Sequence, residues 1–383
     1  MKFLAKTIFG LEELLAKEIE SFGGKNCNIL NRAVSFQGDL DVLYRINYWS
    51  RLALRVLHPI LKFKAHNETV LYKRLRRFDW TNLIRLDHTF KINCVVHSSR
   101  FTHSKYIALK TKDAIVDLFR LKLNNQRPSI SIDNPDVVID VHCYENEFTI
   151  SLDSSGESLH RRGYRLSNRP APLNEVLAAG MILMSGWDRK SVLFDPMCGS
   201  GTILMEAFSI ALNLPPRPER ERYALMKWRG FNRKKWNECK SFMSEEKVLP
   251  GFKLYGFDKN ERLLSETKRQ IRQIGFDQFV ELQRKDFLIN DPPCLEGMII
   301  MNPPYGKRIQ EDQIEQFYGN IGDALKQKYN GWQAWILSGN KEAIKSVGLR
   351  TSKKRTLYNG PIECKYHLYE LYRGSKRTTK DNS

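Results

Sequence analysis

The sequence predicts an α/β protein whose later part, from residue 158 onward, folds around a largely parallel sheet. Three observations support this prediction: strands and helices alternate beyond residue 158, apolar strands end at acidic or amide residues, and a glycine-bearing turn follows the first of these strands. Near the C-terminus, the segments 355–358 and 362–372 flank Asn359-Gly360, a dipeptide typical of hairpin turns. The parallel sheet is therefore expected to end in an antiparallel hairpin.

Length and composition indicate a globular protein with more than one domain. Its 383 residues exceed the length at which one hydrophobic core usually stops growing, so two or three domains are expected. No apolar run approaches the roughly 20 residues that span a bilayer, which argues against a membrane protein. Lys2 and Lys6 interrupt the N-terminal segment, so no signal peptide is expected. Seven scattered cysteines without a C-x-x-C pair predict neither disulfides nor a metal site, and a reducing cytoplasm fits best.

The charge balance points to a polyanionic partner. Lysine and arginine outnumber aspartate and glutamate by 62 to 43, which gives a net charge of +19. A protein of this size rarely carries such an excess without binding a polyanion. Charge alone does not distinguish RNA, DNA and anionic lipid.

Two small α/β units are expected before the main sheet. The first unit comprises a strand over 3–7, a helix capped by Asp39, and between them a helix with Leu11, Leu14, Leu15 and Ile19 on one face. Strands over 91–97, 137–144 and 148–152 make up the second. The expected domains are residues 1–60, 61–157 and 158–375, followed by a flexible tail over 376–383.

The segment 72–80 allows two interpretations. It mixes the cations Arg74, Arg76 and Arg77 with Tyr72 and Trp80, as does a surface that binds phosphates and stacks on unpaired bases. The same pattern also fits a solvated helix face with aromatics that belong to the core, and the sequence does not decide between them.

The strongest single feature is the run Asp195-Pro-Met-Cys-Gly-Ser-Gly-Thr202, which joins a hydrophobic strand to a helix. Gly199 and Gly201 let the backbone approach a ligand at the carboxyl end of a strand, where open α/β sheets bind ligands. A Walker A loop would need a lysine after Gly201, and a dinucleotide fingerprint would need glycine where Leu204 stands. A tight turn without a ligand is the remaining alternative. The loop therefore favours a nucleoside-type cofactor.

Two further strands end at acids. Asp258 closes the strand 254–258 and can accept hydrogen bonds from ribose hydroxyls; a helix N-cap is its alternative role. The 63 residues between Asp195 and Asp258 imply an insertion, assigned to 215–250. Asp286 follows a strand over 280–283 and could bond an adenine amine, with Phe287 beside the ring, although an aspartate in this position is usually a cap or turn residue.

The decisive motif is Asn302-Pro303-Pro304-Tyr305, after the apolar strand 298–301. The prolines lack amide donors and leave their carbonyls free to accept. Asn302 and the Pro303 carbonyl can then accept from an exocyclic NH2 of a base, and Tyr305 can stack on the flipped-out base. This arrangement orients the amine towards a methyl sulfonium, so that catalysis needs orientation rather than a strong general base.

Together these motifs resemble the class I, Rossmann-like amino-methyltransferases, and more narrowly the bacterial THUMP-containing guanine-N2 methyltransferases of large-subunit ribosomal RNA. The segments 112–117, 134–137 and 152–165 resemble that family's THUMP region and its junction. The resemblance implies a ferredoxin-like unit over 1–60, a THUMP domain over 61–157 and a mostly parallel seven-stranded methyltransferase domain over 158–375. Some relatives carry a second, fused methyltransferase domain, whereas this chain ends after the first.

The resemblance also implies a cofactor, an RNA partner and a set of site residues. The cofactor is S-adenosyl-L-methionine, and the partner is 23S ribosomal RNA or tRNA. The residues expected at the cofactor are Asp195, Pro196, Cys198, Gly199, Gly201, Thr202, Asp258, Asp286, Phe287 and Asn302. Those expected at the target base are Asn302, Pro303, Pro304 and Tyr305. Those expected at RNA are Arg74, Arg76, Arg77, Arg161, Arg162 and Arg165.

Other functions remain open at this point. A tRNA guanine-N2 methyltransferase and a DNA adenine-N6 methyltransferase would use the same chemistry, since both targets present an exocyclic amine. An RNA-binding assembly factor without catalysis is the alternative from a different class. Cofactor binding and turnover would distinguish such a factor from an enzyme.

Overall fold

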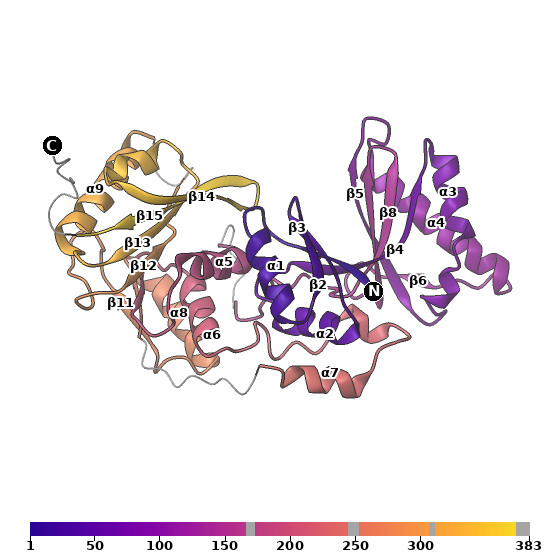
Figure 1. Cartoon of the computed structure of the whole chain (residues 1–383), viewed down its shortest axis with the longest axis horizontal. Helices are drawn as coiled ribbons and strands as arrows, with labels where there is room; N and C mark the ends of the chain where they lie inside the picture. The colour runs from indigo at the N-terminus through magenta and orange to yellow at the C-terminus, as the bar shows by residue number, and fades with distance from the viewer. Residues whose placement is uncertain (166–172, 244–252, 306–310, 373–383) are drawn as a thin grey trace, which may run out of the picture. The chain divides into compact units, whose positions relative to one another are not determined.

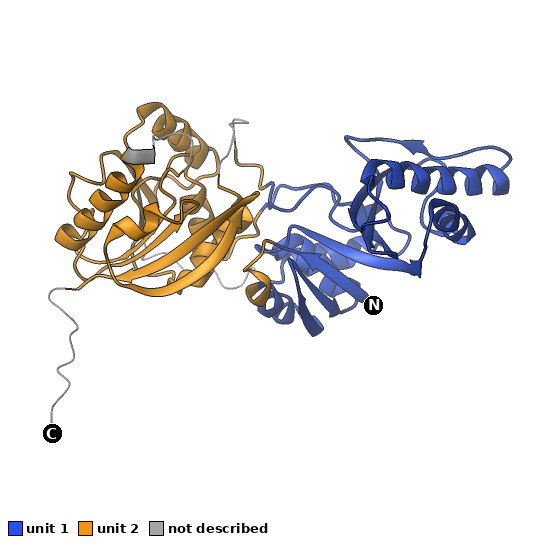
Figure 2. Cartoon of the chain, turned by 90° about the horizontal axis from the view of Figure 1, so that it is seen from above, with its two compact units in different colours: residues 1–7, 15–161, 217–242 blue, residues 8–14, 162–216, 243–383 orange. Residues whose placement is uncertain are grey.

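The computed structural model describes residues 1–165, 173–243, 253–305 and 311–372. The chain forms two compact units (Figure 2). Unit 1 comprises residues 1–7, 15–161 and 217–242, and unit 2 comprises residues 8–14, 162–216 and 243–383. The predicted flexible tail over 376–383 lies outside the described residues.

Unit 1 is built on one eight-stranded sheet in the order β2-β3-β1-β4-β8-β7-β5-β6. Its strands are β1 (Lys2–Lys6), β2 (Lys25–Leu30), β3 (Ala33–Gln37), β4 (Arg55–Lys64), β5 (Thr89–His97), β6 (Ser129–Ile130), β7 (Val137–Tyr144) and β8 (Glu147–Asp153). The long strand β4 pairs with β1 through its first residues and with β8 over almost its whole length. The two small units that the sequence predicts therefore share a single sheet.

The helices of unit 1 follow from local sequence signals. They are α1 (Glu12–Ser21), whose first turn falls in unit 2, α2 (Leu40–Trp49), α3 (Glu68–Arg77), the 3-10 helix η1 (Trp80–Asn82) and α4 (Ser104–Lys122). Asp39 caps α2 as predicted, because its side chain accepts from the Val42 N–H at 2.9 Å. Leu71 and Leu75 of α3 are buried with Ile107 and Ile115 of α4, and the two helices cover one face of the sheet (Figure 1).

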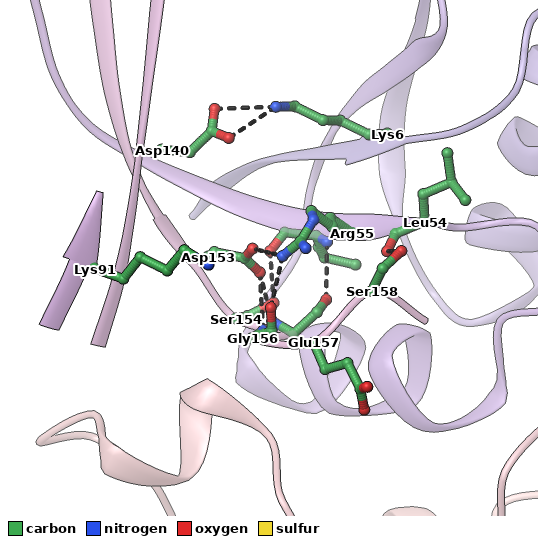
Figure 3. A network of polar contacts seen from close by, with 12 residues as sticks. Lys6, Leu54, Arg55, Lys91, Asp140, Asp153, Ser154, Gly156, Glu157 and Ser158 are labelled. Carbon is green, nitrogen blue, oxygen red and sulfur yellow. Dashed lines mark hydrogen bonds and ion pairs between the residues drawn. The ribbon is translucent and has the colours of Figure 1, made fainter. Parts of the chain in front are cut away.

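A buried polar network fastens the end of β8 to β4 (Figure 3). The Asp153 side chain is fully buried and pairs with Arg55, which also donates to the Gly156 carbonyl at 2.6 Å. Ser154 donates to the Val56 carbonyl at 2.7 Å. These contacts fix the chain at the point where it leaves the sheet.

The insertion between Asp195 and Asp258 contributes to unit 1, although the sequence prediction assigned it to the 158–375 domain. Residues 217–242, with η2 (Ala224–Lys227) and α7 (Arg233–Lys240), cluster with unit 1. Trp236 of α7 is buried against Tyr44 of α2, with ring centroids 5.6 Å apart. The predicted insertion also included residues 244–250, which lie outside the described residues.

Unit 2 contains a seven-stranded sheet in the order β11-β10-β9-β12-β13-β15-β14. Its strands are β9 (Leu193–Asp195), β10 (Leu254–Asp258), β11 (Val280–Arg284), β12 (Met298–Met301), β13 (Gln333–Ser338), β14 (Thr351–Asn359) and β15 (Ile362–Glu370). All neighbours are parallel except β13–β15 and β14–β15. The predicted mostly parallel seven-stranded sheet with a C-terminal hairpin is confirmed.

The turn of this hairpin lies one residue later than the sequence predicts. Asn359 is the last paired residue of β14, opposite Ile362, so the two turn residues are Gly360 and Pro361 rather than Asn359-Gly360. Gly360 has φ +62°, and a glycine with positive φ at the first central position is typical of a type II′ turn. The Asn359 side chain is therefore available for a contact outside the turn.

Helices pack against the sheet of unit 2: α5 (Glu175–Ser185), α6 (Thr202–Ala211), α8 (Glu261–Gln273), α9 (Glu311–Lys328) and the 3-10 helix η3 (Ala343–Val347). Tyr318 and Ile321 of α9 are buried in one core with Ile299 of β12 and Ile336 of β13. The order of the strands reverses between β9 and β12, and such a point is where open α/β sheets bind ligands. No helix among the described residues is long and apolar enough to cross a membrane.

Candidate active site

The glycine loop after β9 is held by backbone hydrogen bonds. The Cys198 N–H donates to the Phe257 carbonyl of β10 at 2.9 Å, and the Gly201 N–H donates to the Cys198 carbonyl at 2.7 Å. Gly201 has φ +71°, and a Cβ there would lie 2.5 Å from the Thr267 side chain, so only glycine fits. At Gly199, with φ +51°, a Cβ would meet no atom of the described part of the chain within 4 Å. The loop therefore presents bare backbone to open space, as the approach of a ligand requires.

The buried residues of this loop shape it rather than expose functional groups. Pro196, Cys198 and Thr202 are all buried. Burial raises the pKa of the Cys198 thiol well above its ordinary value, so the thiol stays protonated and is not a nucleophile. All seven cysteines of the chain are free.

Asp258, at the end of β10, holds the loop from the neighbouring strand. Its carboxylate accepts from the Gly199 N–H at 2.9 Å and from the Asn260 N–H at 2.7 Å. Its alternative role as a helix cap is wrong, because Asn260 caps α8 by accepting from Leu263. Each carboxylate oxygen has a second lone pair, so Asp258 can still accept from ribose hydroxyls.

Asp195 is a buried carboxyl group with no cation beside it among the described residues. It is 2% exposed and accepts from the Met197 N–H at 3.3 Å. Burial raises the pKa of this carboxyl to about 8, the Met197 hydrogen bond opposes the rise, and the negative charge of Asp258 adds to it. None of the ion pairs among the described residues involves Asp195. A cationic ligand group at this position would stabilise the ionised form.

Asp286 is the turn residue after β11 that the alternative interpretation expected. It accepts from the Leu288 N–H at 3.0 Å and pairs with Lys259 at 2.8 Å. Phe287 is 1% exposed and packs in the core, with its ring centroid 5.2 Å from that of Tyr329. The prediction that Phe287 packs beside a cofactor ring is therefore not supported, because its side chain has almost no free surface.

The Asn-Pro-Pro-Tyr motif begins where β12 ends. Because β9 and β12 are adjacent and parallel, Asn302, which follows β12, lies at the same edge of the sheet as Asp195, the last residue of β9. The Asn302 Oδ1 atom is buried, yet it has no hydrogen-bond partner among the described residues. A buried acceptor without a donor carries a free-energy cost, so its retention points to a donor that arrives with a ligand.

Tyr305 is held from the C-terminal hairpin. Its hydroxyl oxygen accepts from Asn359 Nδ2 at 3.0 Å, and burial raises the pKa of the phenol, so that it stays neutral. Its ring also lies against Gly339, which follows β13. Neither Asn359 nor Gly339 was predicted as a site residue, because Asn359-Gly360 has the signature of a hairpin turn and nothing distinguishes Gly339 locally.

The cations and aromatics of the segment 72–80, which spans the end of α3 and the start of η1, have separate roles. Trp80 is fully buried and donates to the Leu75 carbonyl at 2.8 Å, and Tyr72 donates to Asp117 at 2.7 Å. The aromatics therefore belong to the core, as the second interpretation of this segment expected. Arg74, Arg76 and Arg77 are exposed in the last turn of the helix, which leaves them available to phosphates.

The arginines of the 161–165 junction differ in exposure. Arg161 keeps 67% of its side chain exposed beside Glu157. Arg162 is 4% exposed and pairs with the buried Glu206 of α6 at 3.4 Å, so the expectation that it contacts RNA is not supported. Arg165 pairs with Glu175 of α5 at 3.2 Å and is one-quarter exposed. Burial of two glutamates requires positive partners, which gives Arg162 and Arg165 a structural role.

The strand order of unit 2, with a glycine loop after β9 and an Asn-Pro-Pro-Tyr turn after β12, defines a class I methyltransferase that depends on S-adenosylmethionine. Comparison with protein families agrees. The profile described as an RMKL-like methyltransferase domain matches residues 162–367, the RlmL ferredoxin-like domain matches 2–57 and the THUMP domain matches 65–153. This chain belongs to the family of RMKL-like methyltransferases that carry these N-terminal domains.

Individual relatives support the same assignment. A protein of Synechocystis sp., provisionally named an RNA methyltransferase, is 38% identical over 97% of both chains. A protein of Syntrophotalea carbinolica named ribosomal RNA large subunit methyltransferase K/L is 35% identical over 97% of this chain, which spans 54% of that protein. The crystal structure of a provisionally assigned methyltransferase in complex with S-adenosylhomocysteine (SAH) superposes with a TM-score of 0.85 at 26% identity, covering 98% and 99% of the two chains.

Proposed function

We propose that this protein transfers the methyl group of S-adenosylmethionine to the exocyclic N2 of a guanine in 23S ribosomal RNA. The observation that carries the proposal is the buried, unpartnered Asn302 Oδ1 at the start of the Asn-Pro-Pro-Tyr motif. An exocyclic NH2 group supplies the donor that this oxygen lacks. The name of the Syntrophotalea relative supports ribosomal RNA as the substrate, although this chain spans about half the length of that protein.

The residues of the motif orient the amine. Asn302 Oδ1 and the Pro303 carbonyl accept its two hydrogens, which directs the nitrogen lone pair away from the base plane. The ring of Tyr305 stacks on the flipped-out base and keeps the nitrogen in line for attack. S-adenosylmethionine supplies an activated methyl group on a sulfonium. The nitrogen–carbon bond forms as the sulfur–carbon bond breaks, and the amine proton leaves to water.

The residues around the glycine loop fit this cofactor. Open space lies where a side chain of residue 199 would stand, so the bare loop can receive the amino-acid part of the cofactor, and Asp195 gains a cationic neighbour in its ammonium group. Pro196, Cys198, Gly201 and Thr202 give the loop its shape. Asp258 accepts from the ribose hydroxyls, and Asp286 accepts from the adenine amine with the lone pairs that Leu288 and Lys259 leave free.

Unit 1 supplies the RNA contacts. It matches a THUMP domain, and Arg74, Arg76 and Arg77 are exposed together at the end of α3. Arg161, whose side chain is largely exposed, is a fourth arginine of unit 1 that can contact phosphates. With a net charge of +19 on the whole chain, contacts to phosphates give affinity and orientation, and the motif in unit 2 selects the base.

The decisive experiment is transfer of radiolabelled methyl to total RNA from a strain that lacks this gene, followed by nucleoside analysis. We expect label in N2-methylguanosine within the large ribosomal RNA, and none with the Asn302→Ala variant. Label in tRNA would show that the same reaction acts on a different substrate. Absence of label from RNA, with transfer to adenine in DNA, would establish the DNA alternative, and absence of any transfer would favour a non-catalytic RNA-binding factor.

A further inference from the structure

The aromatic residue of the motif is held in place by a residue far along the chain. Asn359 Nδ2 donates to the Tyr305 hydroxyl oxygen at 3.0 Å, and the Cys364 thiol lies 3.8 Å from the same oxygen. Asn359 can reach Tyr305 because it ends β14 opposite Ile362, outside the Gly360-Pro361 turn. The hydrogen bond therefore links the hairpin of the sheet to the motif after β12.

The other constraint on this ring is steric. A Cβ at position 339 would lie 2.5 Å from Tyr305 Cδ2, 2.6 Å from Tyr305 Cε2 and 2.8 Å from Ile362 Cγ2, all closer than real Cβ contacts allow. Gly339 does not adopt a left-handed φ, so glycine is required here by the space that the Tyr305 ring and Ile362 occupy, and not by the backbone conformation. The flat face of the backbone at residue 339 fixes one edge of the ring, and Asn359 fixes the hydroxyl.

We propose that Asn359 and Gly339 are positioning residues that fix the ring plane of Tyr305 before the target base arrives. This proposal rests on the proposed function, because it assumes that Tyr305 stacks on a base. A tyrosine that is free to rotate about its side-chain torsions must be ordered on each binding event, and misplacement of a reacting group by about 1 Å can reduce turnover about a hundredfold. A hydrogen bond at the hydroxyl and a packing surface at the ring edge remove this freedom in advance.

The kinetic test uses Asn359→Ala, Tyr305→Phe and the double variant, with total RNA from a strain that lacks this gene as the substrate. We expect Asn359→Ala to reduce kcat by about tenfold or more while the KM for S-adenosylmethionine stays unchanged. Tyr305→Phe retains the ring but loses the hydroxyl, so it should produce a similar loss. If Asn359 acts through this hydroxyl, its removal costs little in the Tyr305→Phe background. Independent, multiplicative losses in the double variant would overturn the proposal.

Gly339→Ala tests the steric constraint separately. The added methyl group should displace the ring and reduce kcat without loosening the binding of SAH. Gly319→Ala on α9 is the matched control, because a Cβ there meets only the Ser346 carbonyl, at an ordinary 3.6 Å. We expect the control variant to keep wild-type turnover. Equal turnover in Gly339→Ala and Gly319→Ala would show that the space at residue 339 does not position Tyr305.

A spectroscopic readout separates this proposal from the proposed function. With 3-fluorotyrosine incorporated at position 305 of the full chain, the 19F resonance reports the surroundings of this one ring. We expect Asn359→Ala to shift and broaden the resonance, and Gly319→Ala to leave it unchanged. A resonance that is the same with and without the Asn359 side chain would overturn the proposal even if the wild-type protein methylates RNA. If the wild-type protein methylates no RNA, the proposed function fails, whereas the resonance still decides whether Asn359 holds Tyr305.

Discussion

The Asp258 carboxylate accepts the Gly199 N–H at 2.9 Å, so the end of β10 directly restrains the loop that follows β9. The two strands are parallel neighbours, with Gly256 of β10 opposite Asp195 of β9. One carboxylate therefore shapes the glycine loop, and in the proposed function it would also offer its remaining lone pairs to the ribose of the cofactor.

Replacement of Asp258 by alanine should weaken cofactor binding. Hydrogen bonds to a charged group contribute about 1.5–3 kcal/mol, so we expect the Kd of SAH to rise about tenfold to a hundredfold, as measured by isothermal titration calorimetry. Asn260→Ala is the control, because it removes the cap of α8 but no carboxylate. It should lower stability by about 1 kcal/mol and leave the Kd unchanged. Equal Kd values for Asp258→Ala and wild type would exclude the ribose role.

Replacement of Asn302 by alanine should separate turnover from binding. In the proposed function the variant loses the acceptor for the reacting amine, so we expect kcat to fall by about two orders of magnitude or more while the Kd of SAH changes little. Asn302→Asp keeps an oxygen acceptor and should retain more activity than Asn302→Ala. A variant that mainly loses cofactor affinity would show that Asn302 serves the cofactor rather than the base.

Cofactor binding should release a proton from Asp195. Burial raises the pKa of this carboxyl to about 8, so at pH 7 the group is mostly protonated before binding. A cationic ammonium beside it lowers the pKa and drives ionisation, so binding releases a proton below pH 8 and affinity rises with pH through this range. Calorimetry in two buffers of different ionisation enthalpy measures the release. Asp195→Asn should abolish it, and equal release from that variant would assign the proton to another group.

Local signals predicted the strands and loops of unit 2 well. The strand over 254–258 lies within its predicted bounds, and the glycine loop occupies the predicted edge of the sheet. These features depend on hydrophobic runs and on backbone conformations that neighbouring residues specify. The hairpin was also predicted, but its turn was assigned one residue too early, because Asn359-Gly360 and Gly360-Pro361 are both good turn pairs and cross-strand pairing decides between them.

Contacts between residues far apart in the chain could not be predicted in the same way. Arg162 resembles its exposed neighbour Arg161 in sequence, but its partner Glu206 is 44 residues away and buried. Likewise, Trp236 belongs by position to the methyltransferase half, yet it packs on α2 of unit 1. Periodicity reports which face of an element is apolar and not which element covers that face, so these assignments require the tertiary structure.

Neutralisation of the three exposed arginines of α3 should weaken RNA binding and reduce its salt dependence. Each lost phosphate contact lowers the slope of log K against log salt by about 0.7–0.9, so Arg74→Gln, Arg76→Gln and Arg77→Gln together should lower it by about two. The control replaces Lys268, Arg269 and Arg272, which are exposed on α8 of unit 2, with glutamine. An unchanged slope for the α3 variant would place the RNA contacts on another part of the surface.

Loss of Arg55 should destabilise unit 1 in a pH-dependent way. Asp153 is fully buried and accepts from Arg55 and from the N–H groups of Ser155 and Gly156. Arg55→Leu removes the ion-pair partner of this buried carboxylate and leaves only the longer-range charge of the buried Arg220 near it, which costs about 3 kcal/mol, as measured by urea unfolding at neutral pH. Burial raises the pKa of Asp153 even with Arg55 present, and loss of Arg55 raises it further. The carboxyl group therefore becomes protonated more readily as the pH falls, so the deficit should shrink in acid.

The double variant Arg55→Leu/Asp153→Asn tests this explanation. The amide keeps an oxygen acceptor for the N–H groups of Ser155 and Gly156 but carries no charge, so the double variant should be more stable than Arg55→Leu alone, and its deficit should not depend on pH. If the two variants are equally stable at neutral pH, the deficit comes from lost packing of the Arg55 side chain. Because Arg55 also donates to the Gly156 carbonyl, part of the deficit should remain in both variants. The difference between them then measures the cost of a carboxylate that has lost its ion-pair partner at the point where the chain leaves the sheet of unit 1.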